Sequence, residues 1–224
     1  MEFKNITEEQ ARKLWTWLFM AKTKNAVISI KNGLLVWESG EWIDGTWYGG
    51  IWKDGRWVSG EWKGGTWENG TWMNGMWENG IWKSGHWDGG TWLNGIWKGG
   101  RWFTGNWYDG TWMNGHWQNG TWYSGHWKNG TAERITAYHI IWENGRWESG
   151  TFINGIWKDG KWIDGEWMDG IWLKGHWNNG LWRNGIWKDG LWENGKWFNG
   201  TWKDGEWKAG SFLGGYRMTK PENQ

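Results

Sequence analysis

The 224-residue chain contains no cysteine and only one proline. Without cysteine, disulfides and thiolate-metal sites are excluded, and the redox compartment is undetermined. An excess of one charge is also missing, because 25 Lys and Arg against 24 Asp and Glu leave a net charge of +1. No overall field therefore favours nucleic acid or an anionic membrane. No apolar run approaches the roughly 18 residues of a membrane-spanning helix, and no signal-peptide pattern begins the chain. We therefore expect no membrane partner and no Sec export.

Tryptophan and glycine are the residues in excess, with 34 and 40 copies. From residue 37 to residue 212 an aromatic residue occupies almost every fifth position, and a glycine follows three residues after it. No insertion or deletion breaks this register. A fixed short period indicates a repeat architecture, and so many aromatic residues argue against disorder.

The repeat unit is Gly-x1-Trp-x3-x4, in which x4 is mostly Asn, Asp, Ser or Gly. The pair x4-Gly is typical of a turn, which makes x1-Trp-x3 a short strand. Side chains alternate along a strand, so Trp faces inward, opposite to the often charged x1 and x3. In the exceptional stretch 130–142, Ala132 and Ala137 replace Trp while Ile135 and Ile140 replace Gly. This exchange of large for small is typical of one packed core.

The outward positions indicate how many units complete a turn. The Ile residues at x1 are separated only by multiples of 15, at Ile51, Ile81, Ile96, Ile141, Ile156, Ile171 and Ile186. Most Lys residues at x3 also share one 15-residue column. We therefore predict an all-β fold, a three-sided β-solenoid with 15-residue coils, three pentads per coil and Trp inward. The alternative is an antiparallel meander with a two-residue hairpin turn at each x4-Gly, which would favour even multiples of five.

The ends of the chain depart from the repeat. Residues 1–24 predict an N-terminal capping helix that starts with a capping box from Thr7 to Gln10 and continues to about Lys22. Residues 25–36 predict a hairpin around Asn32-Gly33 that leads into the repeat. The repeat itself spans 37–215, and 216–224 form a polar C-terminal tail.

The five-residue period, with an inward large residue two places after an inward small one and Asx-Gly corners, resembles the pentapeptide-repeat proteins. Those are right-handed β-helices with four pentads per coil, and they carry Leu or Phe where this chain has Trp. The Gly-x-Trp-x-x-Gly pattern is also similar to tryptophan-glycine repeats of marine bacteriophage proteins and, distantly, to MORN repeats. These resemblances cover 37–215. They imply a structural or interaction protein associated with a virion, and they carry over no catalytic residues. Because no signal-peptide pattern is present, we expect a cytoplasmic or virion-associated location.

Outward side chains of a solenoid form columns, and two columns at one corner are apolar. This apolar ridge comprises Tyr48, Ile51, Leu93, Ile96, Tyr108, Tyr123, Tyr138, Ile141, Ile153 and Ile156. Long apolar patches are unusual on soluble monomers. We predict that the ridge binds protein, either a second copy in a homo-oligomer or a larger assembly such as a phage particle. The alternative is that such residues merely suit strands.

A second corner carries a basic edge of Lys53, Arg56, Lys83, His86, Lys98 and Arg101. With exposed aromatic residues, it supports an alternative function as a module for glycan or nucleic acid, although the near-zero net charge disfavours nucleic acid. The interruption, marked by Glu133, Arg134, Tyr138 and His139, is either a functional site or drift with a compensating core exchange. No catalytic set, phosphate loop or metal-spaced cluster appears, so we predict a non-enzymatic protein without cofactor or metal.

Overall fold

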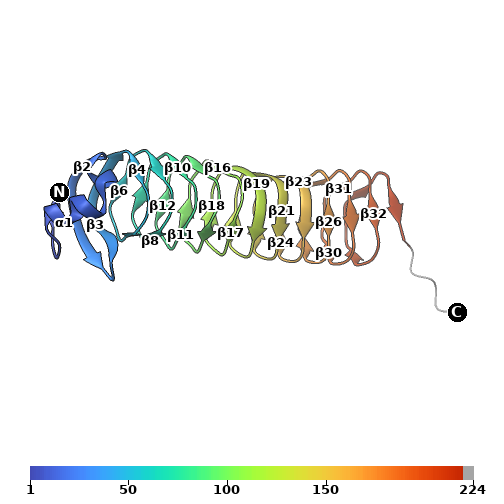
Figure 1. Ribbon diagram of the computed structural model, residues 1–224. Coiled ribbons are helices and arrows are strands. Elements are labelled where there is room, and N and C mark those ends of the chain that lie inside the picture. Colours follow the sequence, from blue (N-terminus) through green and yellow to red (C-terminus); the bar gives the residue numbers. More distant parts are fainter. Residues whose placement is uncertain (219–224) are drawn as a thin grey trace. The chain divides into compact units, whose positions relative to one another are not determined.

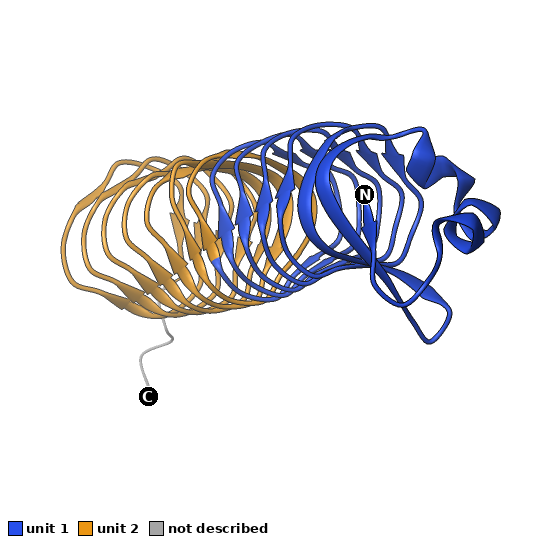
Figure 2. Cartoon of the chain, turned by 90° about the vertical axis from the view of Figure 1, so that its left-hand side faces the viewer, with its two compact units in different colours: residues 1–115 blue, residues 116–224 orange. Residues whose placement is uncertain are grey.

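The computed structural model describes residues 1–218 and is an all-β, parallel β-solenoid of about 12 turns with a tryptophan core (Figure 1). The chain divides into two compact units, residues 1–115 and 116–224 (Figure 2). In both, strands pair in parallel with partners fifteen residues away, as Ile81 does with Ile96 in unit 1 and Ile156 with Ile171 in unit 2. This pairing confirms the three-sided solenoid and shows that the antiparallel meander is wrong.

Unit 1 begins with a compact cap and continues as regular coils. Its elements before the regular repeat are β1 (Glu2–Phe3), α1 (Glu8–Leu14), the 3-10 helix η1 (Thr16–Phe19), β2 (Lys22–Lys31) and β3 (Leu34–Asp44). Two-residue strands of x1 and Trp then follow every five residues: β4 (Thr46–Trp47), β5 (Ile51–Trp52), β6 (Arg56–Trp57), β7 (Glu61–Trp62), β8 (Thr66–Trp67), β9 (Thr71–Trp72), β10 (Met76–Trp77), β11 (Ile81–Trp82), β12 (His86–Trp87), β13 (Thr91–Trp92), β14 (Ile96–Trp97), β15 (Arg101–Trp102), β16 (Asn106–Trp107) and β17 (Thr111–Trp112).

The cap differs in detail from the single helix predicted to about Lys22. Thr7 does cap α1 in a capping box with Gln10, but the helix ends at Leu14 and Trp15 adopts a non-helical backbone with φ −136°. The edge of the first coil is covered by β2, which pairs antiparallel with β3 around the predicted Asn32-Gly33 turn. The indole of Trp17 packs on Trp47 with ring centroids 5.2 Å apart. Helix and hairpin together therefore close this end of the core.

Backbone hydrogen bonds join each coil to the one before it by a repeated rule. The N–H of x1 donates to a glycine carbonyl sixteen residues earlier, and the N–H of x3 donates to a tryptophan carbonyl sixteen residues earlier. Examples are Ile81 N to Gly65 O at 2.9 Å and Lys83 N to Trp67 O at 2.8 Å. Many corners are also capped locally, as where Gly80 N donates to Oδ1 of Asn79 at 2.8 Å. The Asn and Asp residues expected at x4 thus accept hydrogen bonds from the N–H groups of the corner glycines.

The corner glycine is required for two separate reasons. At Gly90 the backbone has φ +111°, a region that residues with a Cβ rarely adopt. A Cβ built there would also lie 2.4 Å from the carbonyl oxygen of Gly75 in the preceding coil. The coil spacing set by the hydrogen bonds therefore leaves no room for a side chain at this corner.

The core of unit 1 consists of three ladders of stacked indoles. Trp residues fifteen apart lie with ring centroids 4.7–5.1 Å apart and planes within 8° of parallel. Trp residues five apart meet edge to face, as Trp82 and Trp87 do at 5.9 Å and 76°. Both arrangements are favoured by the aromatic quadrupole. Every repeat Trp of this unit is fully buried.

Unit 2 contains the same kind of coil but includes three longer strands. Its strands are β18 (His116–Trp117), β19 (Gly120–Trp127), β20 (Thr131–Ala132), β21 (Ile135–Trp142), β22 (Arg146–Trp147), β23 (Gly150–Trp157), β24 (Lys161–Trp162), β25 (Glu166–Trp167), β26 (Ile171–Trp172), β27 (His176–Trp177), β28 (Leu181–Trp182), β29 (Ile186–Trp187), β30 (Leu191–Trp192), β31 (Lys196–Trp197), β32 (Thr201–Trp202), β33 (Glu206–Trp207), β34 (Ser211–Phe212) and β35 (Tyr216–Arg217).

The interruption at 130–142 changes the backbone at the corners of its coil but leaves the fifteen-residue pairing register intact. Ile135 and Ile140 are fully buried, as are Ala132 and Ala137, which confirms the predicted core exchange. In the interrupted coil the residue with a left-handed backbone is Arg134, with φ +45°, one position before the glycine position that Ile135 occupies. The N–H of Arg134 donates to Oγ of Ser149 at 3.1 Å. Since neither Ile has a positive φ, β21 runs straight through a corner that is bent in most coils.

The predicted tail divides at the end of the described residues. Tyr216 and Arg217 form β35, which pairs with β32, so the first residues of 216–224 extend the solenoid. The guanidinium of Arg217 lies 5.7 Å from the ring centroid of Trp202. Residues 219–224 lie outside the described part of the chain.

Candidate interaction surface

The apolar ridge of unit 2 lies on the three long strands. β19, β21 and β23 are each eight residues long and pair in register, so Ile141 lies beside Ile156 and His139 beside Asn154. The ridge was predicted as two apolar columns on either side of a corner. The structure instead makes it a short, continuous parallel sheet, because the buried Ile135 and Ile140 hold β21 extended.

Two ridge tyrosines form a stacked pair on this sheet. The rings of Tyr123 and Tyr138 lie 5.5 Å apart with their planes 9° from parallel. Their exposed fractions are 36% and 37%, so the stacked rings remain accessible to solvent. Ile153 continues the column and is half-buried, and Met168 follows with an exposed fraction of 39%. The interruption therefore lies directly under the most continuous apolar part of the ridge.

Arg183 breaks the ridge beyond Met168. Its guanidinium lies 4.4 Å from the ring centroid of Phe198 and its Nε donates to Oε1 of Glu166 at 2.6 Å. Sequence reasoning omitted this arginine, although its position in the same 15-residue column is visible in the sequence. The uninterrupted apolar stretch of unit 2 therefore runs from Tyr123 to Met168.

In unit 1 the ridge is divided. Lys63 and Glu78 occupy the column between Tyr48 and Leu93, and Lys63 Nζ lies 2.5 Å from Glu78 Oε1. The hydrogen bonds that Lys63 makes with Glu78 and Glu61 raise its pKa. Tyr48, although 57% exposed, also packs on Trp17 of the cap at 5.7 Å. The remaining members of the ridge in this unit are the half-buried Ile51 and Leu93 and the exposed Ile96 and Tyr108.

Carboxylates balance much of the basic edge. Lys53 Nζ lies 2.7 Å from Glu38, Arg56 lies 4.0 Å from Glu41, and Lys83 lies 2.9 Å from Glu68. Each carboxylate is in the same column, one coil earlier. The hydrogen bonds from Lys53 and Ser29 lower the pKa of Glu38. Such partly exposed pairs contribute little stability but cancel local positive charge.

The remaining residues of the basic edge lie close to one another in unit 1. His86 pairs in register with Arg101, and Lys98 lies on the other side of the Gly99-Gly100 corner. No carboxylate among residues 1–218 lies within ion-pair distance of Lys98 or Arg101. The uncompensated positive charge is therefore confined to this part of the edge.

The four residues of the interruption do not form one cluster. Glu133 and Arg134 precede β21, whereas Tyr138 and His139 lie in its middle. Oε1 of Glu133 lies 3.4 Å from Nε2 of His116. Tyr138 joins the stacked pair, and His139 is exposed beside it.

A charged node that sequence reasoning missed lies on another side of the interrupted coil. Glu143 accepts hydrogen bonds from Lys158 at 2.9 Å and from Lys128 at 3.2 Å, and His126 lies 3.9 Å away. The hydrogen bond from Lys158, and then that from Lys128, lower the pKa of Glu143 against the opposing effect of burial. The 15-residue spacing of Lys128, Glu143 and Lys158 was the available signal.

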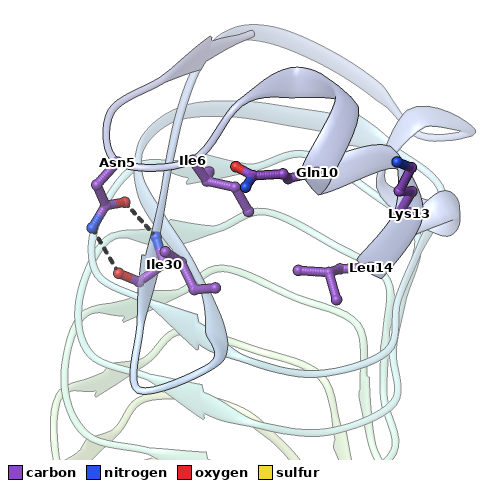
Figure 3. A pocket seen from close by; sticks show the side chains of 6 residues that line it. All are labelled: Asn5, Ile6, Gln10, Lys13, Leu14 and Ile30. Carbon is purple, nitrogen blue, oxygen red and sulfur yellow. Dashed lines mark hydrogen bonds between the residues drawn. The ribbon is translucent and has the colours of Figure 1, made fainter.

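The cap of unit 1 contains a shallow apolar groove of about 350 Å³ between α1 and β2 (Figure 3). Its lining residues are Asn5, Ile6, Gln10, Lys13, Leu14 and Ile30. The amide of Asn5 is occupied, since it donates to Ile30 O at 2.8 Å and accepts from Ile30 N at 2.7 Å. Gln10 is likewise engaged in the capping box. The groove thus offers an apolar surface whose main polar groups already have partners.

Comparisons with known proteins yield no match among protein-family models, curated proteins or solved structures. The five-residue repeat and parallel coils are consistent with a pentapeptide-repeat-like fold, with three pentads per coil in place of four. Among residues 1–218, no three His, Asp or Glu residues are placed to hold a metal ion. Within the same range, no helix is long and apolar enough to cross a membrane.

Proposed function

We propose that the chain is a non-enzymatic structural or adaptor element that associates with protein through its apolar ridge. The observation that carries this proposal is the stacked, solvent-accessible Tyr123–Tyr138 pair on the three long strands of unit 2. Paired rings form a rigid apolar surface that loses little side-chain entropy on binding, and aromatic anchors dominate the energetics of protein interfaces.

The partner we propose first is a second copy of the chain in a homo-oligomer. Columns that repeat along a parallel sheet present the same surface at successive coils, so two copies can align their ridges along several coils at once. A larger assembly is the other partner of this class. The resemblance to bacteriophage tryptophan-glycine repeats suggests a phage particle as that assembly, with a virion-associated location.

The native mass of the full chain, measured by size-exclusion chromatography with light scattering, tests this proposal. The double variant Tyr123→Glu/Tyr138→Glu should dissociate the oligomer, because two carboxylates would be desolvated in the interface. The matched control is Ile163→Glu/Leu173→Glu, which changes two half-buried outward aliphatic residues away from the ridge. It should retain the parental mass.

The ridge proposal fails if the tyrosine double variant keeps the parental oligomer while its thermal unfolding is unchanged. If the parent is a monomer, homo-association is refuted. The larger assembly is then tested by asking whether the parent, but not the tyrosine variant, co-sediments with particles from the native source.

A second candidate function is binding of an anionic polymer, either glycan or nucleic acid, at the basic edge. The observation in its favour is that Lys98 and Arg101, which lie beside His86 in unit 1, have no carboxylate within ion-pair distance among residues 1–218. Lys98→Glu/Arg101→Glu should abolish retention on immobilised heparin, and parental retention should fall steeply with salt, since counterions are released on binding. Equal retention of parent and variant would remove this candidate without touching the ridge proposal.

A further inference from the structure

The indoles of unit 2 stack in ladders on the C-terminal side of the interruption. Trp residues fifteen apart stack at 4.6–4.8 Å with planes 4–10° from parallel. Neighbouring ladders also touch edge to face, as at Trp172 and Trp177, 5.9 Å apart. Each indole in these coils therefore has ring contacts both along its own ladder and across to the others.

The interrupted coil reduces three ladders to one. Of its three core positions, 132 and 137 carry alanine and only 142 carries a ring. Trp142 stacks on Trp127 at 4.6 Å and on Trp157 at 4.8 Å. Across Ala132, by contrast, Trp117 and Trp147 are separated by two coil spacings, about 9.6 Å. Within the core of unit 2, every path of contacting indoles through this coil therefore passes through Trp142.

One ladder is also interrupted at the next coil. Phe152 stacks on Trp167 at 4.0 Å, so it fills the indole position sterically. A benzene ring is much harder to oxidise than an indole. Phe152 therefore maintains the packing of the ladder but cannot carry the charge. The paths that remain reach Trp142 from Trp157 by stacking or from Trp147 by an edge contact at 5.7 Å.

The indole protons are held inside the core. The Nε1–H groups of Trp162, Trp177 and Trp192 donate to backbone carbonyls at 3.1 Å, and a carbonyl is too weak a base to accept the proton. The Nε1 atoms of Trp142 and Trp157 are buried with no acceptor in hydrogen-bond geometry. An indole that loses an electron in this core therefore keeps its proton and stays a radical cation.

We propose that the indole ladders of unit 2 transfer single positive charges (electron holes), which are introduced by an outer-sphere one-electron oxidant. In the interrupted coil, Trp142 is the indole through which the charge passes. The oxidant takes one electron from the partly exposed Trp207, which stacks on Trp192 at 4.8 Å, and is itself reduced by one electron. Each radical cation then takes an electron from the neighbouring indole. No bond forms or breaks and no proton moves, so the charge advances one ring at each step.

The experiment uses the full chain with a photo-oxidant at one end of the path and a trap at the other. Because the chain has no native cysteine, Ala209→Cys gives a single site for a ruthenium tris-bipyridine label. The carbonyl of residue 209 accepts the Trp192 indole N–H, so the label lies beside a ladder. An electron donor, 3-aminotyrosine, replaces Gln118, which follows Trp117 beyond the crossing. Flash oxidation of the label with hexaammineruthenium(III) starts the transfer.

Transient absorption of the aminotyrosyl radical is the readout, compared between Trp142→Phe and the matched control Trp172→Phe. The phenylalanine keeps a ring in the stack, as Phe152 does, but removes the oxidisable indole. We expect the radical in the parent and in Trp172→Phe, because Trp162 and Trp167 in the same coil supply a bypass. We expect its loss in Trp142→Phe. Moving the trap to Ile163, on the label's side of the crossing, should restore the signal in Trp142→Phe, which shows that its core is intact.

Three outcomes would overturn the inference. A parent without radical at 118 would mean that the stack does not conduct, and an undiminished signal in Trp142→Phe would mean that charge crosses elsewhere. Loss of the signal in both variants, with the trap at 118, would mean that the ladders do not act as parallel paths. None of these outcomes bears on the ridge, which lies on the outer surface.

Discussion

Core tryptophans should differ in their contribution to stability according to the number of rings around them. Trp172 is fully buried, stacks on Trp157 and Trp187 at 4.7 Å, and meets two further indoles edge to face. Truncation of a buried Trp to Ala removes its transfer free energy and leaves a cavity, at a cost of roughly 3–5 kcal/mol. The lost ring contacts, each worth about 0.5–1.5 kcal/mol, place Trp172→Ala at the upper end of that range.

Trp207 is the matched comparison. Its ring is partly exposed and has only one stacked Trp partner, Trp192. Trp207→Ala should therefore cost less than about 2 kcal/mol, since less apolar surface is buried and no closed cavity forms. Guanidinium unfolding followed by tryptophan emission measures both free energies of unfolding. Equal losses in the two variants would refute the claim that stacking within closed ladders stabilises the solenoid.

Two further predictions concern the corner and the charged node. Gly90→Ala should lower the free energy of unfolding by about 1–3 kcal/mol, because alanine is strained at φ +111° and its Cβ would meet Gly75 O. Gly64→Ala, where the nearest atom would be 4.0 Å away, should have no such cost, and a similar loss at both sites would contradict the argument. Glu143 has a pKa lowered by Lys158 and Lys128, so its carboxylate stabilises the folded state above the ordinary value of 4.5. That stabilisation is lost as the pH falls through the lowered pKa, so thermal unfolding of the parent and Glu143→Gln should differ at neutral pH and converge in acid; a constant difference would exclude this linkage.

Several local features could be predicted because their causes are local in the chain. Thr7 and Gln10 lie three residues apart, so a capping box is visible as a sequence pattern. The Asn32-Gly33 turn was predicted in the same way, from residues that tolerate positive φ. The helix end at Leu14 was not predicted. Beyond it, Trp17 packs on Trp47 of the first coil, and helical periodicity contains no information about this contact.

The candidate surface was predictable only in part. The 15-residue columns placed Tyr123 and Tyr138 together, but not the stacking of their rings. Nor could the columns show that β21 runs straight through its corner, because this depends on where the buried Ile135 and Ile140 find space beside Ala132 and Ala137. Lys63 and Glu78 are fifteen residues apart in the same column, so their ion pair was predictable from the sequence, although it was not predicted.

The sequence by itself determined the inward face and the five-residue period, and its 15-residue columns favoured the three-sided coil over the meander that the parallel pairing then excluded. Strict spacing of Trp and Gly puts the rings on one face of the short strands and a residue without Cβ at all but two of the glycine positions. Only the tertiary structure decided how the rings meet, which charges cancel and what the interruption does. These depend on contacts between residues fifteen or more apart, where the geometry of one coil is set by the coils packed against it.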